Sequence, residues 1–177
     1  AVGNLGHLPI VEGLGLEVRG DFGLNVFNSR ALAFLRELGL ASATVSFELR
    51  HQQVRDLAKL LPCEGIVYGR LPLMVMENCI TKNNVGCRHG AGSTLTDRTG
   101  AQFPVQCVYG CRNEIENSLP LFLADKAEWR GCGLTSARLR FTTETADECA
   151  AVLRRYRGEG DYAPEKYTRG LFYRGVE

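Results

Sequence analysis

Four cysteines close together are the feature that most constrains this chain. An almost unbroken apolar run, GIVYGRLPLMVM, precedes them, and a turn-rich, strand-like stretch, STLTDRTGAQFPVQCVYG, contains the third. Loops and hairpins that gather soft thiolate ligands are the usual means by which proteins hold zinc or an iron–sulfur cluster. The spacing C-x7-C followed by C-x3-C therefore predicts a metal site in a cysteine-rich insert over 79–111. The predicted ligands are Cys79, Cys87, Cys107 and Cys111.

Two other interpretations of these cysteines stay open. Free cysteine is among the most frequently buried residue types, so the four thiols could be unrelated core residues. They could also form disulfides, but the odd total of seven cysteines, and a first segment without the features of a secretory signal, favour a reducing compartment. We therefore expect reduced thiols in a cytoplasmic protein. His89, two residues after Cys87, is an additional candidate ligand.

The composition is that of an ordinary soluble globular protein, with 45% hydrophobic and 23% charged residues. No apolar run approaches the roughly 18 residues that a membrane span needs. The formal net charge of +1 provides no general attraction for nucleic acid, so an RNA partner would need a local basic patch. Neither a G-x-G-x-x-G motif nor a phosphate-binding loop is present, which leaves dinucleotide and ATP binding without support.

Strand-like and helical segments alternate along the chain. SRALAFLRELG has apolar residues at helical spacing, with Ser29 as a candidate cap and Gly39 as a left-handed stop. HQQVRDLAKLL and LADKAEWRGCG are further helical segments. TADECAAVLRRYRG begins with Thr145 and Glu148 in capping-box positions, which predicts another helix. Between them, ATVSFE, GIVYGRLPLMVM and SARLRFTTE are predicted strands, the second of them buried on both faces.

This alternation predicts an α/β fold. GLASATVSF and GLTSARLRF each follow a helical segment and share G-L-x-S-A-x-(V/L)-x-F, which suggests a repeated βα unit. We count about four such units, half of the eight in a closed barrel. We therefore expect residues 1–177 to form a single unit, part of a TIM-type (β/α) barrel with a cysteine-bearing β-hairpin insert. The open edge of such a sheet would favour self-association.

Acidic and basic side chains lie where the predicted strands end. In α/β folds the chemistry gathers at the carboxyl ends of the strands. Two carboxylates meeting there could act as general acid and base, or could make ordinary caps and ion pairs. Two arginines that alternate on one strand share a face, where they could bind an anionic group or stay in solvent. The candidate catalytic residues are Asp21, Glu48, Glu77, Arg138 and Arg140.

Several segments resemble the collagenase-like family of unassigned peptidases. They are YGRLPLMVMENC, LTDRTGAQFPV, CRNEIENSLPLFLAD, RLRFTTE and TRGLFYRGVE, and GDFGLNVFNS and VSFEL are similar to the family's barrel-strand pattern. The resemblance runs from about Gly20 to Glu177 and is closest to the final part of the long members. It implies a TIM-type barrel whose first strands lie before residue 1. The rest of a longer polypeptide would then be the partner that completes the barrel.

The resemblance also implies a cofactor. Branches of this family that hydroxylate tRNA or rRNA bases, or the ubiquinone ring, without oxygen hold a four-iron–four-sulfur (4Fe–4S) cluster on four cysteines. In them the first ligand follows G-R-x-P-L, which corresponds to Cys79, and a thiol in the C-R-N segment corresponds to Cys111. Where the long members often have a cysteine pair, this chain has only Cys87. The fourth ligand is therefore Cys107 or His89, and the metal is a 4Fe–4S cluster or zinc.

Three functions follow from these observations. The first is a metal-containing enzyme of oxygen-independent hydroxylation or RNA modification, which the thiolate set favours. The second is a collagenase-like protease with a peptide substrate, although no nucleophile–base pair or zinc-protease helix motif is visible in the sequence. The third is a structural zinc module that completes a larger protein.

Overall fold

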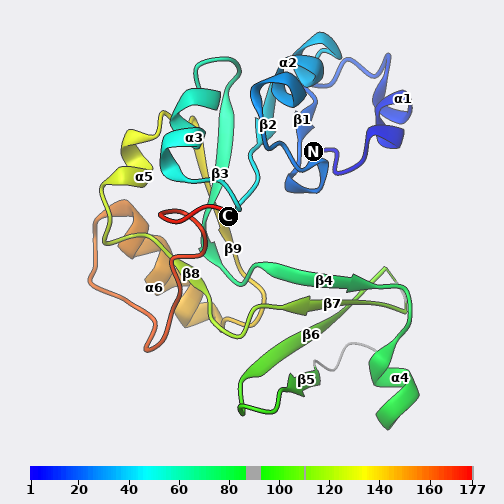
Figure 1. The fold of residues 1–177 in the computed structure, drawn as a ribbon, viewed down its shortest axis with the longest axis vertical. Coiled ribbons are helices and arrows are strands. Elements are labelled where there is room, and N and C mark those ends of the chain that lie inside the picture. The colour runs from blue at the N-terminus through cyan, green and yellow to red at the C-terminus, as the bar shows by residue number, and fades with distance from the viewer. Residues whose placement is uncertain (87–92, 110, 177) are drawn as a thin grey trace. The chain divides into compact units, whose positions relative to one another are not determined.

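A computed structural model describes residues 1–86, 93–109 and 111–176 (Figure 1). None of its helices is long and apolar enough to cross a membrane, within that described part of the chain. The described residues divide into two compact units. The first unit comprises Ala1–Tyr68, Phe122–Leu139 and Arg169–Glu177, and the second comprises Gly69–Leu121 and Arg140–Thr168.

The first unit is built on short parallel strands. Gly20 pairs with Ala43, and Ala43 with Cys63, so the first three strands run side by side in the same direction. The third strand is central in the sheet, because two later strands also pair with it. The strands are β1 (Arg19–Gly20), β2 (Ser42–Thr44), β3 (Cys63–Gly69), β8 (Leu121–Phe122) and β9 (Ser136–Arg140).

Local sequence signals explain the helices of the first unit. The helix predicted over SRALAFLRELG is confirmed, but its cap is Asn28, whose side chain accepts a hydrogen bond from the Ala31 N–H at 2.9 Å. Gly39 has a φ of +81°, as a left-handed stop requires. The helices are η1 (Leu5–His7), α1 (Leu8–Val11), η2 (Phe22–Leu24), α2 (Ser29–Glu37), α3 (His51–Leu57) and α5 (Glu128–Gly131).

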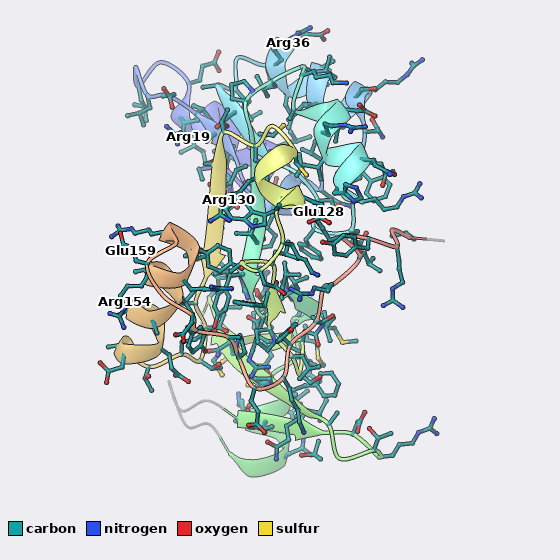
Figure 2. All side chains as sticks on the ribbon, turned by 90° about the vertical axis from the view of Figure 1, so that its left-hand side faces the viewer. Arg19, Arg36, Glu128, Arg130, Arg154 and Glu159 are labelled. Atoms are coloured by element: carbon teal, nitrogen blue, oxygen red, sulfur yellow. The ribbon has the colours of Figure 1, made fainter. Side chains whose placement is uncertain are left out.

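The second unit is built on an antiparallel sheet with the strand order β4-β7-β6-β5. The predicted capping box at the start of α6 is confirmed, because Thr145 and Glu148 each accept a hydrogen bond from the other's N–H. Charged side chains such as Arg154 and Glu159 lie around the end of this helix (Figure 2). The elements are β4 (Pro72–Met76), α4 (Ile80–Val85), β5 (Ser93–Thr96), β6 (Gln102–Val108), β7 (Arg112–Glu116) and α6 (Ala146–Arg157).

The expectation of a partial TIM-type barrel with about four βα units is wrong. The described residues form one mixed and one antiparallel sheet, with 26% strand and 28% helix, and no closed barrel. The run GIVYGRLPLMVM, which we predicted as one strand buried on both faces, is divided between the two sheets. The break lies at Gly69, whose φ of +114° suits glycine and where an added Cβ would collide with the Arg140 carbonyl. Beyond it, Met74 and Val75 are more than half exposed.

Candidate functional site

Three of the four predicted thiol ligands lie at one end of the antiparallel sheet. Met76, Asn113 and Cys107 are cross-strand partners in one row, on β4, β7 and β6. Cys79 follows Met76 by three residues, and Cys111 directly precedes β7 in the hairpin from β6. The register therefore gathers these cysteines at the same end of the sheet. The other two candidate ligands, Cys87 and His89, lie outside the described residues.

One buried amide side chain connects two of the thiol-bearing segments. Asn113 is completely buried, and its Oδ1 accepts a hydrogen bond from the Ile80 N–H at 2.8 Å, immediately after Cys79. Its Nδ2 donates to Sγ of Cys107 at 3.5 Å. The Cys79 sulfur in turn accepts a hydrogen bond from the Lys82 N–H at 3.3 Å, as the N-cap of α4. N–H groups that donate to ligand sulfurs are typical of iron–sulfur and zinc–thiolate sites, so the donor chemistry fits such a group.

The three thiols differ in exposure. Cys79 is 7% exposed, whereas Cys107 and Cys111 are exposed on the hairpin. Across residues 1–86, 93–109 and 111–176, no three His, Cys, Asp or Glu side chains are grouped as a metal site.

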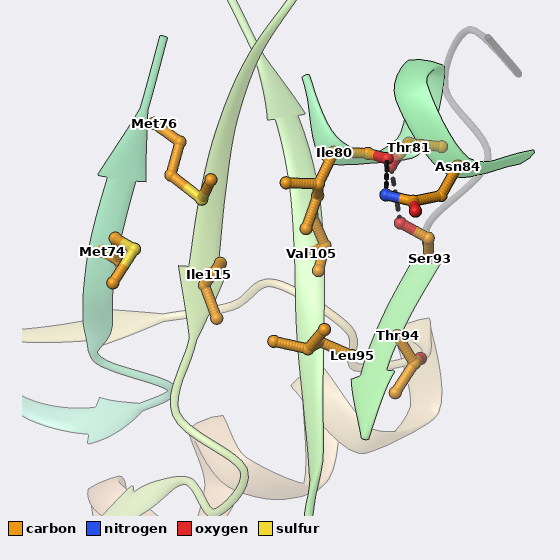
Figure 3. Close-up of a pocket in the computed structure, with 10 residues that line it drawn as sticks. All are labelled: Met74, Met76, Ile80, Thr81, Asn84, Ser93, Thr94, Leu95, Val105 and Ile115. Atoms are coloured by element: carbon orange, nitrogen blue, oxygen red, sulfur yellow. Dashed lines mark hydrogen bonds between the residues drawn. The ribbon is translucent and has the colours of Figure 1, made fainter. Parts of the chain in front are cut away.

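A pocket of about 500 Å³ opens on the face of the sheet that carries Asn113 and Cys107. Ile115 and Val105 form its buried floor, and each lies two residues from Asn113 or Cys107 on the same strand. Side chains two residues apart on a strand point to the same face, so the pocket and these polar groups share that face. The lining residues are Met74, Met76, Ile80, Thr81, Asn84, Ser93, Thr94, Leu95, Val105 and Ile115 (Figure 3).

The pocket has an apolar floor and a small polar rim. None of the described residues that line it is charged. Thr81 Oγ1 and Ser93 Oγ are hydrogen-bonded at 2.9 Å, and Asn84 Nδ2 donates to the Ile80 carbonyl at 2.8 Å (Figure 3). A volume of this size and a mostly apolar lining with a few placed polar groups are typical of small-molecule pockets. This pocket suits an uncharged ring, which the thioethers of its two methionines can contact favourably.

Of the candidate catalytic residues in the first unit, the structure brings Asp21 and Arg138 together but not Glu48. The Arg138 guanidinium pairs with Asp21 and with Glu64, each at 2.5 Å, and these three side chains are about a quarter exposed. Thr44 Oγ1, which is buried, donates to Glu64 at 3.0 Å. Arg138 is therefore already shared between two carboxylates. Glu48 is half-buried in the loop after β2, where its N–H donates to Ser46 Oγ at 3.4 Å.

The remaining candidates belong to the second unit. Glu77 is 80% exposed and forms an ion pair with Arg112. Arg140 pairs with Glu114 and Glu116, so it is engaged by protein carboxylates within this unit. Arg138 and Arg140, predicted to share one face of a strand, belong to separate ion-pair clusters.

Sequence reasoning missed several residues that build these sites. Asn113, Glu114 and Glu116 all come from β7, where CRNEIENS concentrates polar residues in a strand of a sheet. Such a density of polar residues in a strand could have indicated these three residues from the sequence. Glu64 was harder to find, because it lies alone near the start of the apolar strand β3.

Comparisons with known proteins give no further information about these sites. No protein-family model, curated protein or solved structure matches this chain. The resemblance to the collagenase-like peptidase family therefore depends on the motifs quoted above.

Proposed function

We propose that the second unit holds a 4Fe–4S cluster on Cys79, Cys87, Cys107 and Cys111, as part of an enzyme of oxygen-independent hydroxylation. The observation that carries this proposal is the buried amide of Asn113, which bonds to the Cys107 sulfur and to the backbone beside Cys79. A side chain that holds two thiol-bearing segments at one end of a sheet orients the ligands before a metal binds. Four thiolates are also the donor set that a 4Fe–4S cluster prefers.

The reaction class follows from the resemblance to the collagenase-like peptidase family, whose hydroxylating branches hold such a cluster. When bound, the cluster would supply electron transfer. The chain's own residues would orient the sulfurs through Asn113 and receive the substrate in the neighbouring pocket. The uncharged lining of that pocket supports a ring such as a nucleobase, and RNA is the substrate that we propose.

Metal content tests this proposal directly. We expect the full chain, purified without oxygen, to contain about four iron and four sulfide per chain and to show the visible absorbance of an iron–sulfur cluster. A Cys79→Ala variant should lose both, because one of four ligands is removed. Iron and sulfide analysis with an ultraviolet–visible spectrum provides the measurement.

A matched control separates ligand loss from general damage. Cys149→Ala removes another thiol of the second unit, half-buried on α6 and outside the proposed ligand set, so it should leave the metal content unchanged. One equivalent of zinc without a visible band would contradict the cluster and favour a structural zinc site. Full cluster content in Cys79→Ala would contradict the assigned ligands.

A further inference from the structure

Two glutamates and one arginine form a buried cluster on the other face of the antiparallel sheet. Glu114 and Glu116 are two residues apart on β7, so both point away from the face that carries Asn113 and Ile115. The Glu116 side chain is 0% exposed, and those of Glu114 and Arg140 are 15% and 17% exposed. Arg140 donates to Glu116 at 2.7 Å through one nitrogen and to Glu114 through the other. The single guanidinium of Arg140 thus pairs with two carboxyl groups.

One further cation lies on this face of β7: Arg112, two residues before Glu114, but its guanidinium forms an ion pair with Glu77. Pro72 and Val75 on β4 lie opposite Glu116 and Glu114, and Gln106 on β6 also lies opposite Glu114. All three are uncharged. The nearby guanidinium of Arg70 donates instead to backbone carbonyls of the loop after β7 and to the Thr143 hydroxyl. If both glutamates were ionised, the cluster would have one excess negative charge shielded from water. Burying an uncompensated charge costs folding free energy.

One oxygen atom of the cluster has no partner. Oε1 of Glu116 is buried and lacks a hydrogen bond among the described residues. Glu114 and Glu116 each pair with one terminal nitrogen of the same Arg140 guanidinium, which brings the two carboxyl groups close to each other. Two carboxyl groups that share one buried site do not both ionise readily, because each negative charge disfavours the other.

We propose that Glu114 and Glu116 share one proton at neutral pH, so that a carboxylic acid, a carboxylate and the Arg140 guanidinium form a neutral buried triad. A proton on Glu116 removes the excess negative charge and makes its partnerless oxygen part of a neutral group, which costs less free energy to bury than a carboxylate oxygen. This inference is independent of the metal site, because the triad lies on the opposite face of the sheet and shares no residue with the proposed ligands.

The triad makes the stability of the second unit sensitive to pH. Burial, together with the neighbouring Glu114 charge, raises the pKa of Glu116 from its ordinary value of 4.5, although Arg140 opposes the shift. A carboxyl group whose pKa is raised in the folded state stabilises the fold fully below its unfolded pKa. That contribution is lost as the pH rises from about 4.5 through the raised value. The free energy of unfolding should therefore decrease as the pH increases over this range.

Glu116→Gln tests the proposal, because the amide keeps the shape and one donor of the protonated acid. Urea unfolding of the full chain at a series of pH values should show a falling stability in the wild type. In Glu116→Gln this dependence should be largely lost, with stability retained at alkaline pH. Glu159→Gln is the matched control: its side chain is exposed after α6 (Figure 2), so the wild-type pH dependence should persist.

Infrared spectroscopy provides a second measurement that requires no stable variant. The wild-type chain at neutral pH should show the carbonyl stretch of a protonated carboxylic acid, because exposed carboxyl groups are ionised there. Absence of this band would overturn the proposal, whether or not Glu116→Gln folds. An unchanged pH dependence in Glu116→Gln would also overturn it.

Discussion

At the scale of single residues, Asn113 has the largest structural role in the proposed site. It is the only residue in the row Met76–Asn113–Cys107 whose side chain bonds to two other segments in the described structure. Its amide has both a donor and an acceptor, and it uses the donor for a sulfur and the acceptor for a backbone N–H. Neither an aliphatic residue nor an aspartate can make the same two contacts.

Replacing Asn113 with Ala should therefore weaken both the fold and the metal site. The Ile80 N–H, which is half-buried, loses its acceptor, and the lost hydrogen bond lowers the free energy of unfolding by about 1 kcal/mol. Metal content should fall because the segments of Cys79 and Cys107 are no longer held in place. Urea unfolding and iron analysis on the same preparation measure the two effects.

The half-buried Asn117 side chain is not suitable as a control, because it accepts a hydrogen bond from the Leu119 N–H. Asn84→Ala is better matched: its amide donates to the Ile80 carbonyl within α4 and lies at the pocket rim. We expect it to retain the metal. Wild-type metal content in Asn113→Ala would exclude the orienting role.

At the scale of elements, the pocket arises because α4 follows β4 and lies over one face of the antiparallel sheet (Figure 3). The side chains of Ile80, Thr81 and Asn84 form one wall, while Val105 and Ile115 form the floor. A short helix placed against a sheet face encloses an apolar volume that neither element could form alone.

Met74→Glu should impair this pocket without unfolding the unit. Met74 lines the pocket but is 53% exposed, so a carboxylate there can stay hydrated while it brings charge to an apolar site. Binding of an uncharged naphthylamine dye, followed by its fluorescence, should weaken roughly tenfold or more, equivalent to about 1.4 kcal/mol. The cluster absorbance should be unaffected.

Leu73→Glu is the control for charge alone, because Leu73 is 55% exposed and does not line the pocket. The first unit contains a second apolar groove of about 440 Å³, beside Phe34 and Leu38. If dye binds in that groove, a Phe34→Glu variant should show weaker dye fluorescence. Loss of dye binding in Phe34→Glu but not in Met74→Glu would exclude the pocket of the second unit as the binding site.

At the scale of the whole molecule, the first unit is assembled from three separate stretches of chain. Arg169 joins the last stretch to the middle one, through two hydrogen bonds to the Asp125 carboxylate at 2.6 Å and one to the Phe122 carbonyl. The Phe172 carbonyl accepts a hydrogen bond from the His51 N–H at 2.9 Å, which joins it to the first stretch. The C-terminal segment therefore stabilises the unit by linking distant parts of the sequence.

Arg169→Ala should destabilise the first unit by about 1 kcal/mol, since the pair is bidentate but partly exposed. Hydrogen bonding to Arg169 lowers the pKa of Asp125 from its ordinary value of 3.8. Its stabilising contribution is therefore present above that value and is lost as the pH falls through the lowered pKa. In urea unfolding, the difference from wild type should shrink at acid pH. Arg174→Ala, an exposed change in the same segment, should show little difference at any pH.

The sequence alone determined the local features of this protein. The capping box of Thr145 and Glu148, the stop at Gly39 and the helix over SRALAFLRELG are confirmed, because each depends on residues within one or two turns. The repeated motif in GLASATVSF and GLTSARLRF likewise contains β2 and β9, which both pair with β3. The cysteine spacing predicted a shared metal site, which stays a prediction, and the structure places Cys79, Cys107 and Cys111 at one end of the antiparallel sheet.

Only the tertiary structure decided which strands pair and which charges meet. GIVYGRLPLMVM reads as one apolar strand, but the break at Gly69 assigns its second half to an antiparallel sheet. Arg140 and Glu116 are 24 residues apart, and their ion pair exists because separate strands bring them together. Pairing between distant strands depends on packing and register over the whole chain, which local patterns do not encode. For the same reason, the buried contacts of Asn113 could not be read from the cysteine spacing.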